Sequence, residues 1–508
     1  MEIRVMSNPE SKAWLCPVCG YIHHGPEPPQ MCPVCGSPKE VFESYQAPAQ
    51  PAAKSKIARW RCLNCSYVHS GEQPPESCPV CGAAIDCFEP LSEEAKETSR
   101  AEKAGTIVIV GAGIAGLAAA EAVRASSPDA EVMLIAKEAS PPYYRLNLTR
   151  YLAGEITEAA LPVKPQDWFG DNRIQLLLGD DVSKLKLDQK AVELHHGGDK
   201  AFDKLILTVG AHPFMPPFPG AQRDGVTSLR TLADAQRILQ SDLKGKKCAC
   251  IGGGLLGLET AGALARQGAE VTLLEGHGWL LPRQLNRRAG EILAGHVAGS
   301  GIALRTKART REILGDERVR GLLLEDESVI DTDLVVVATG VRSNSYLGRV
   351  AGLDVNQGIV VDNLLCTSHP DVFAAGDVAE HHGNIYGTWG PAQYQGSIAG
   401  MNALGANVEF GGIPRSNALK VLQLELFSVG QIEPVDGSYE TIENEGDRGF
   451  FTFVFRDTHL VGAILLGDAK LATQVKKAVE SKRDFSDLLM KHPPADDVLQ
   501  YLAEKSVS

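Results

Sequence analysis

The sequence lacks any apolar run that reaches the ~18 residues of a membrane-spanning helix. Its first residues, 1–4, lack the apolar core of a signal peptide. Positive charge is also in deficit, because 50 Lys and Arg stand against 63 Asp and Glu, which gives a net charge of −13. So acidic a chain offers no basic face to a nucleic acid. We therefore expect a cytoplasmic protein that has no membrane or nucleic-acid partner.

Cysteine occurs in a metal-binding pattern. Eight of the 12 cysteines form four Cys-x-x-Cys pairs near the N-terminus. In a cytoplasmic chain such pairs indicate metal ligation rather than disulfides. Two successive pairs form a Cys-x2-Cys-x12-Cys-x2-Cys unit, which presents four thiolates for a tetrahedral site. The predicted ligands are Cys16, Cys19, Cys32 and Cys35 in the first unit and Cys62, Cys65, Cys78 and Cys81 in the second.

The two units belong to an internal repeat with an offset of 46 residues. Modules this small cannot build a sufficient core, so bound metal must supply much of their folding energy. Four sulfurs select zinc or iron, and the spacing leaves both open. The flanking residues Trp14, Tyr21 and Phe42, with Cys-Pro-Val-Cys-Gly between them, closely resemble the rubredoxin-like domain of rubrerythrins. That resemblance implies one iron per module, with zinc as the alternative.

A dinucleotide fingerprint follows the short β-branched run at 106–110. Gly111, Gly113 and Gly116 have the spacing at which a tight turn, a close approach to a diphosphate and close helix–strand packing are needed. The helix expected from about Ile114 would direct its N-terminal amides at that diphosphate. Glu138 lies 22 residues beyond Gly116, where a carboxylate can accept from ribose hydroxyls.

A second fingerprint follows a strand at 248–251. Gly252, Gly254 and Gly257 repeat the spacing, and Glu275 ends the next strand 18 residues past Gly257. No arginine follows closely, so the acid favours NADH over NADPH. Two fingerprints indicate two dinucleotides, and a hydride donor beside an electron carrier is the natural pair.

From about 105 to 405 the chain resembles the two-dinucleotide-fold flavoproteins of the pyridine nucleotide-disulfide oxidoreductase superfamily, in particular the NADH:rubredoxin oxidoreductase branch. The motifs that carry this resemblance are the two fingerprints and Val372-Phe373-Ala374-Ala375-Gly376-Asp377. The resemblance implies that Gly376 and Asp377 bind the ribityl and diphosphate part of FAD and that Arg145 contacts the flavin.

The same resemblance matches Arg150 and Glu259 to a Lys–Glu pair beside the reactive flavin nitrogen. Here arginine replaces the lysine, and its wider fork changes the geometry of the pair. A helix opening near 391–393 matches the one aimed at the flavin's pyrimidine edge. For Trp389 we expect packing near the start of that helix rather than stacking on the flavin.

The stretch between Gly111 and Val209 has no cysteine at all. The resemblance implies that a disulfide reductase or a peroxidase of this fold would carry its redox cysteines there. Cys248 and Cys250 precede the second fingerprint and Cys366 lies in or beside a strand, so we expect all three to be buried and inert.

The predicted fold is α/β, with two Rossmann-like FAD- and NAD-binding domains, two small rubredoxin-like knuckles before them and an α+β domain after them. The predicted domains are 1–46 and 47–92 (rubredoxin-like), 93–104 (linker), 105–240 with 331–405 (FAD), 241–330 (NAD) and 406–508 (C-terminal). In the last domain, the alternation of Phe451, Phe453 and Phe455 with Thr452 and Val454 predicts a half-buried strand. The resemblance allows this domain to support a homodimer or cover the flavin.

The resulting hypothesis is electron transfer from NADH through FAD to the two iron modules and on to an external acceptor, such as a rubrerythrin-like or other electron-transfer protein. Two alternatives stay open at this point. One is an NADH oxidase, or a peroxide- or oxygen-reducing flavoprotein, with structural zinc ribbons. The other is a flavoprotein subunit that docks to a reductase complex through its ribbons.

Overall fold

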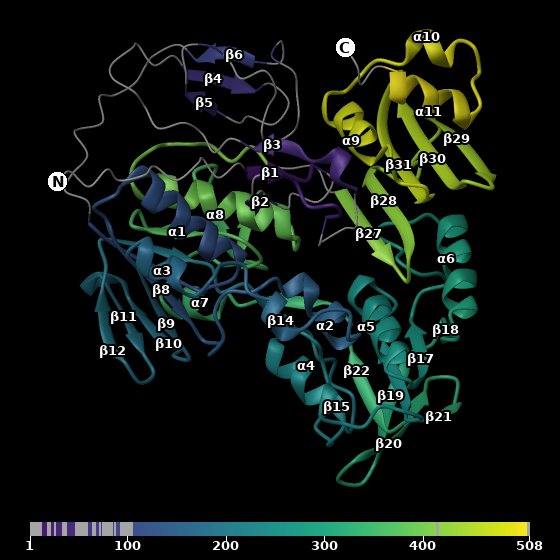
Figure 1. Ribbon diagram of the computed structural model, residues 1–508, viewed down its shortest axis with the longest axis horizontal. Coiled ribbons are helices and arrows are strands. Elements are labelled where there is room, and N and C mark those ends of the chain that lie inside the picture. The colour runs from purple at the N-terminus through teal and green to yellow at the C-terminus, as the bar shows by residue number, and fades with distance from the viewer. Residues whose placement is uncertain are drawn as a thin grey trace, which may run out of the picture.

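The computed structural model describes residues 13–17, 22–24, 27–32, 38–45, 59–62, 68–70, 73, 85, 88–91, 105–412 and 416–504 (Figure 1). Within these ranges no helix has the length and apolar composition that crossing a bilayer requires. Three predicted ligands, Cys16, Cys32 and Cys62, fall in these ranges. The other five, Cys19, Cys35, Cys65, Cys78 and Cys81, and the linker at 93–104 lie outside the described residues.

Two three-stranded antiparallel sheets near the N-terminus share one topology, β2-β1-β3 and β5-β4-β6. Trp14 in β1 lies opposite His23, and Trp60 in β4 lies opposite His69. Both partners are displaced by the same 46 residues, so the sequence repeat is also a repeat of strand register. The strands are β1 Ala13–Leu15, β2 Ile22–His24, β3 Glu43–Tyr45, β4 Arg59–Cys62, β5 Val68–Ser70 and β6 Phe88–Leu91.

A five-stranded parallel sheet of order β25-β13-β7-β8-β9 forms the centre of the first dinucleotide domain. Its middle strand β7 is apolar and buried from Ile107 to Val110, as a parallel strand covered on both faces must be. The five strands are β7 Thr106–Val110, β8 Glu131–Ala136, β9 Ile174–Leu178, β13 Lys204–Leu207 and β25 Val372–Ala374.

Two helices, α1 (Ile114–Ser126) and α8 (Trp389–Ala403), lie side by side over this sheet (Figure 1). Glycines make their close contact possible, because a Cβ on Gly396 would lie 2.1 Å from the Ala115 carbonyl oxygen. The smaller elements around this sheet are η3 Arg145–Asn147, α2 Leu148–Leu152, α3 Asp167–Asp171, β10 Val182–Lys186, β11 Ala191–Leu194, β12 Gly198–Ala201, α7 Tyr346–Val350, β24 Ile359–Val361 and β26 Ala379–His381.

The second dinucleotide domain repeats the plan with a parallel sheet of order β15-β22-β16-β17-β18. An antiparallel sheet, β19-β20-β21, accompanies it. The elements are β15 Val226–Thr227, α4 Leu232–Leu239, β16 Lys247–Ile251, α5 Leu255–Arg266, β17 Glu270–Glu275, α6 Arg287–Gly299, β18 Ala303–Thr306, β19 Thr310–Gly315, β20 Val319–Leu324, β21 Val329–Asp331 and β22 Leu334–Val337.

The chain crosses between the two domains at β14 (Ala211–Pro213) and β23 (Val341–Ser343), which pair with each other. Strands β15 and β22 therefore lie in the second sheet, although the expected domain limits of 241–330 left both in the first. The limits differ because β22 joins this sheet by pairing with β15 and β16, which are distant from it in the sequence.

The C-terminal domain is an antiparallel sheet of order β27-β28-β31-β30-β29 covered by three helices. Its elements are β27 Ser416–Val421, β28 Leu424–Gly430, β29 Tyr439–Gly446, β30 Gly449–Arg456, β31 His459–Gly467, α9 Ala472–Glu480, α10 Ser486–Leu489 and α11 Ala495–Glu504.

The expectation that β30 is half-buried is wrong, because Thr452 and Val454 are as fully buried as the phenylalanines between them. The sheet is covered on both sides. Phe451 packs in a cluster with the C-terminal helices, whereas Phe450 packs in a cluster with the second dinucleotide domain. A strand covered on both faces loses the polar–apolar alternation on which the prediction depended.

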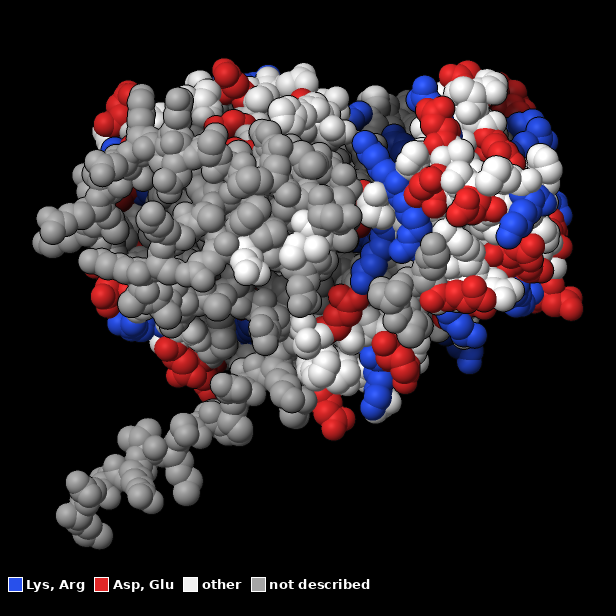
Figure 2. All heavy atoms as spheres, turned by 90° about the horizontal axis from the view of Figure 1, so that it is seen from above, with Lys and Arg blue, Asp and Glu red and all other residues white. Residues whose placement is uncertain are grey.

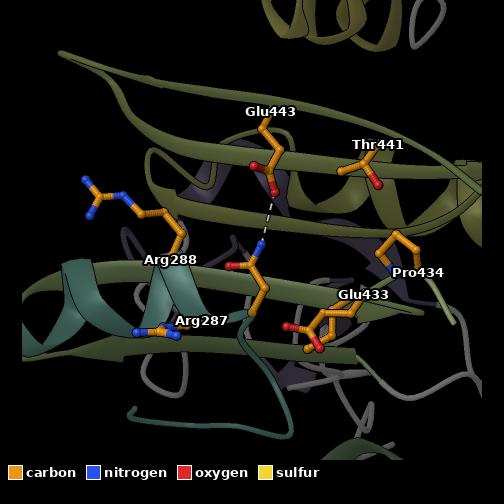
Figure 3. Close-up of a pocket in the computed structure, with 8 residues that line it drawn as sticks. Arg287, Arg288, Glu433, Pro434, Thr441 and Glu443 are labelled. Carbon is orange, nitrogen blue, oxygen red and sulfur yellow. Dashed lines mark hydrogen bonds between the residues drawn. The ribbon is translucent and has the colours of Figure 1, made fainter. Parts of the chain in front are cut away.

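Polar contacts also join the C-terminal domain to the second dinucleotide domain. Asn286, the N-cap of α6, donates to Glu443 on β29 at 3.1 Å across a cleft of about 340 Å³ (Figure 3). Next to it, Arg288 donates to both carboxylate oxygens of Glu445 at 2.7 and 2.6 Å. These bonds and the apolar cluster fix the last sheet against the cofactor domains.

Candidate functional site

The loop after β7 carries the first glycine fingerprint. Gly111 has a φ of +106°, and a Cβ there would lie 2.3 Å from the Thr208 carbonyl oxygen. A Cβ on Gly116 would lie 1.9 Å from the Gly111 carbonyl oxygen. Gly113 instead borders open space and caps α1 without a side chain. This loop therefore offers a diphosphate both room and the free amides at the start of α1.

The loop after β16 repeats this arrangement for the second fingerprint. Gly252 has a φ of +113°, a Cβ on Gly257 would lie 1.8 Å from the Gly252 carbonyl oxygen, and Gly254 borders open space. The three glycines thus have the same geometry in both loops, and their part in binding dinucleotides stays a prediction.

Glu275 is buried at the end of β17 and is held by backbone amides. Gly253 N donates to one carboxylate oxygen at 2.8 Å, and His277 N donates to the other at 2.6 Å. Each oxygen keeps a further lone pair for a hydroxyl donor. The carboxylate is thus held in a fixed position beside the fingerprint.

Glu138 lies at the end of the corresponding strand of the first domain, in a network with Arg145. Arg145 Nη2 lies 2.5 Å from one carboxylate oxygen, and the Tyr143 hydroxyl donates to the other at 2.7 Å. Arg145 also donates through Nη1 to the carbonyl oxygen of Arg230. The network holds the Glu138 carboxylate and the Arg145 guanidinium close to each other.

Asp377 follows β25, and Arg230 Nη2 donates to it at 3.0 Å. Through Arg230, Asp377 is connected to Arg145 and Glu138, so the three predicted FAD residues meet in one region. Gly376, with a φ of +80°, donates its amide to Gln395 Oε1 on α8 at 2.8 Å. The structure therefore brings the first fingerprint, the second flavin motif and α8 together.

Some polar side-chain atoms lie on η3 and α8, the elements around the first glycine loop, which we call the first cradle. Within the described part of the chain, Asn147 Oδ1, Gln393 Oε1 and Gln395 Nε2 are buried without a hydrogen bond. Buried polar groups are nearly always paired. Together with the open space at Gly113, these atoms fit a bound dinucleotide, and the space at Gly254 fits a second one.

Arg150 and Glu259 have different partners among the described residues. Arg150 Nε donates to Glu155 at 3.1 Å, and Glu155 also pairs with Arg266. Glu259, on α5, accepts from the Thr149 hydroxyl at 3.1 Å. Burial raises the pKa of Glu259 to about 7, and the Thr149 bond works against this rise. The predicted role of both residues beside the flavin stays a prediction.

Trp389 begins α8 and stacks on Tyr144, with ring centroids 5.4 Å apart. The helix thus starts slightly before the expected opening at 391–393. Trp389 is buried, in agreement with the packing role expected for it. Tyr144 directly precedes Arg145, so this stack adjoins the residues that surround the first cradle.

The three cysteines outside the modules are poor nucleophiles. Cys248 and Cys250 are fully buried, and burial raises the pKa of Cys248 to about 11 and that of Cys250 further. Cys366 is only half-buried, which corrects the expectation of full burial, although burial still raises its pKa. None of the three offers a ready thiolate for electron transfer.

The first metal module packs into the C-terminal domain. Cys16 and Cys32 are 0% and 3% exposed and, with Phe42, belong to one buried cluster with Phe427 and Phe453 of the sheet. A buried thiol pair between small strands fits a thiolate-bound metal, for which the remaining predicted ligands lie outside the described residues. Cys62 ends β4 in the second module, as its repeat partner Cys16 follows β1.

Several residues of the site escaped sequence reasoning. Arg230 and Thr149 lie 147 and 110 positions from the residues that they bond. Gln395 and Tyr143 lie only 19 and 5 positions from theirs, but they belong to no motif. Thr208 lies 97 positions from Gly111 in the sequence. Its hydroxyl donates to the Gly111 carbonyl oxygen at 2.6 Å, so it supports the first glycine turn.

Two glycine cradles on two parallel sheets, each with an acid at the end of the second strand, define an oxidoreductase with two dinucleotide-binding domains. The model of the pyridine nucleotide-disulphide oxidoreductase family matches residues 105–396, well over half of the chain. The chain belongs to this family. Residues 416–483 match the rubredoxin NAD+ reductase C-terminal domain, and residues 14–43 and 60–89 match the rubrerythrin rubredoxin-like domain. These matches confirm the resemblances inferred from the sequence and the predicted fold class.

Nitrite reductase [NAD(P)H] of Bacillus subtilis is 34% identical over 75% of this chain and 48% of its own length. The chain thus spans about half of that relative. NADH-rubredoxin oxidoreductase of Clostridium acetobutylicum is 30% identical over 76% of this chain and 97% of its length. The crystal structure of NADH:rubredoxin oxidoreductase from Clostridium acetobutylicum superposes with a TM-score of 0.66 at 28% identity, covering 78% of this chain and 100% of that one.

Proposed function

We propose that this protein oxidises NADH and transfers the electrons, by way of a bound FAD, to rubredoxin-type iron centres in its own N-terminal modules and from there to an external acceptor. One observation carries the proposal. The chain has two dinucleotide cradles but no cysteine between Gly111 and Val209, while eight cysteines are gathered in the attached modules. The flavin's usual thiol relay is missing, and the modules are the electron acceptors that the chain itself supplies.

The residues of the first cradle would hold FAD. Gly111, Gly113 and Gly116 shape the diphosphate loop, and α1 directs its amides there. The other residues that would contact FAD are Glu138, Arg145, Gly376 and Asp377. When bound, FAD accepts a hydride from a reduced nicotinamide and releases electrons singly, which suits a one-electron metal centre.

The residues of the second cradle would hold NADH. Gly252, Gly254 and Gly257 form the diphosphate loop, and Glu275 accepts from the ribose 2′-hydroxyl. A phosphate at that position would meet a buried carboxylate, so NADH is favoured over NADPH. In this proposal Glu259, whose pKa burial raises to about 7, and Arg150 position the reacting groups beside the flavin.

The metal in both modules is iron rather than zinc, bound by the eight cysteines named above. The external acceptor is a rubrerythrin-like protein or another electron carrier. The names of the relatives support this reading, since nitrite reductase, an assimilatory nitrate reductase electron transfer subunit and NADH-rubredoxin oxidoreductase all act in electron transfer. A homodimer through the C-terminal domain is the proposed assembly.

Metal analysis of the purified protein tests the iron assignment. We expect about two iron atoms per chain, one per tetrathiolate site, and the visible absorption of ferric thiolate beside that of FAD. Stoichiometric zinc with a flavin spectrum alone would overturn the electron-transfer role of the modules. It would favour an oxidase that keeps full NADH turnover when residues 1–100 are deleted.

A further inference from the structure

The first module is seated on the C-terminal domain in a specific way. Its Phe42, Cys16 and Cys32 share a buried cluster with residues of β28, β30, α9 and α11. Figure 1 shows β1 to β3 beside this domain. Phe42 is only 7% exposed, so the seat is a packed interface rather than a chance contact.

One ion pair fixes the orientation of the module on this seat. Lys477 Nζ on α9 lies 3.0 Å from Glu43 Oε1 on β3. Both side chains are about half exposed, so the pair contributes little to the strength of docking. The pair matters more for the orientation of the module than for the strength of docking, because a charge pair at the rim of an interface sets register and orientation.

The charge around this pair is complementary. Five cationic residues lie on α9 or next to it, namely Lys470, Lys476, Lys477, Lys482 and Arg483. Figure 2 shows Lys and Arg side chains in a row along the edge of the C-terminal domain. Among its described residues the first module has three acids, Glu27, Glu40 and Glu43, and one lysine, Lys39. The α9 edge therefore attracts the acidic module.

The apolar cluster that contains Cys16 and Cys32 extends to the segment around Arg145, which we propose binds FAD. Tyr144 packs against the cluster that contains Cys16 and Cys32, and its ring stacks on Trp389 at the start of α8. Arg145, the next residue, belongs to the network of the first cradle. A continuous packed path thus runs from two ligands of the first metal site to residues beside the first cradle.

We propose that the first module, held in transfer position by the α9 edge through Glu43 and Lys477, accepts electrons directly from the flavin. This inference rests on the proposed function. One NADH supplies two electrons and a proton. Two ferric centres, one per module, take one electron each, and the proton leaves to solvent while NAD+ is formed.

Carbodiimide coupling tests the seat without any turnover. This reagent joins a carboxylate and an amine that touch, with loss of water to the carbodiimide, so the folded protein should yield a Glu43–Lys477 amide detectable by peptide mass spectrometry. Lys477→Arg should remove the product but keep the ion pair. Coupling of Glu43 to other lysines instead would overturn the proposed seat.

Rapid mixing with NADH under anaerobic conditions tests direct transfer to the first module. Lys477→Glu should leave flavin reduction unchanged and slow the first phase of ferric bleaching roughly five- to tenfold, because an attraction becomes a repulsion. The double swap Glu43→Lys with Lys477→Glu, and Lys477→Arg alone, should restore the rate. Lys244→Glu, with the same change in net charge on an exposed lysine of the second dinucleotide domain, should have no effect.

A variant of the second module provides a further test. Cys62→Ser with Cys65→Ser should remove its iron and leave the first bleaching phase intact, whereas loss of that phase would overturn the inference. Unchanged bleaching in Lys477→Glu would also overturn the inference while leaving the proposed function in place. Flavin reduction without any bleaching in the unaltered protein would contradict the proposed function itself.

Discussion

Glu259 on α5 accepts a hydrogen bond from Thr149 on α2, with the two oxygens 3.1 Å apart. The contact joins the second dinucleotide domain to the segment that follows Arg145. Burial raises the pKa of Glu259 from 4.5 to about 7, so the carboxyl is poised to change charge near neutral pH. This pair makes the stability of the protein depend on pH.

The native state keeps a proton on Glu259 between pH 4.5 and about 7, where the unfolded chain has lost it. Stability therefore falls as pH rises through this window. Glu259→Gln should flatten the fall and raise the free energy of unfolding at pH 8 by at most about 3 kcal/mol, because the carboxyl keeps some hydration. The thermal midpoint at pH 8 should rise accordingly. Thermal unfolding from pH 4.5 to 8 measures this.

Thr149→Val provides the opposite change, since it removes the bond that lowers the pKa of Glu259. The pH window should then extend upward. Equal pH slopes in the unaltered protein and in Glu259→Gln would show that this carboxyl is not the group that titrates.

Gly113 and Gly116, both in the first cradle, should respond differently to substitution. Gly113→Val fills the space left for a diphosphate without meeting protein atoms at its Cβ, so the fold should persist. FAD should bind on the order of 100-fold more weakly, as hydrogen bonds to a charged group are lost. Fluorescence titration of the FAD-free protein with FAD measures the effect.

Gly116→Ala is the matched control, because its Cβ would lie 1.9 Å from the Gly111 carbonyl oxygen. We expect this variant to lose stability as well as FAD. If Gly113→Val instead bound FAD normally, the diphosphate would not lie in this loop.

Glu275 should set the choice of nicotinamide cofactor. Its carboxylate is fixed by the amides of Gly253 and His277, so a 2′-phosphate would face an immobile negative charge. Glu275→Gln removes that charge and keeps the size of the side chain. The ratio of kcat/KM for NADH to that for NADPH should fall at least roughly tenfold. A preference for NADPH in the unaltered protein would refute this assignment.

Arg230 should matter for FAD although no motif contains it. It donates to Asp377 at 3.0 Å and supplies the carbonyl oxygen that Arg145 contacts. Arg230→Gln leaves the half-buried Asp377 without its cationic partner, so FAD affinity should fall roughly tenfold. Arg237→Gln, at an exposed arginine on α4, should bind FAD as the unaltered protein does.

The glycine spacing and the acids after it could be predicted because local backbone geometry demands them. A turn at Gly111 and a contact at Gly116 leave no room for a side chain, so the sequence must show the motif. The repeat was equally visible, since its register recurs at 46 residues. These features depend on residues close to one another in the chain.

What the sequence could not predict depends on distant partners. Arg230 and Asp377 are separated by 147 positions, and Lys477 and Glu43 by 434. The burial of β30 on both faces depends on the domains that pack against it. The placement of β15 and β22 in the second sheet depends on pairing between distant strands. Periodicity within one strand does not carry that information.

Anaerobic titration with NADH, followed in the visible spectrum, tests the central proposal most directly. If electrons pass from NADH through FAD to two iron centres, full reduction should take about two NADH per chain, one for the flavin and one for both irons, and the ferric bands should bleach. Uptake of about one NADH with flavin bleaching alone would show that the N-terminal modules carry no electrons and would contradict the account.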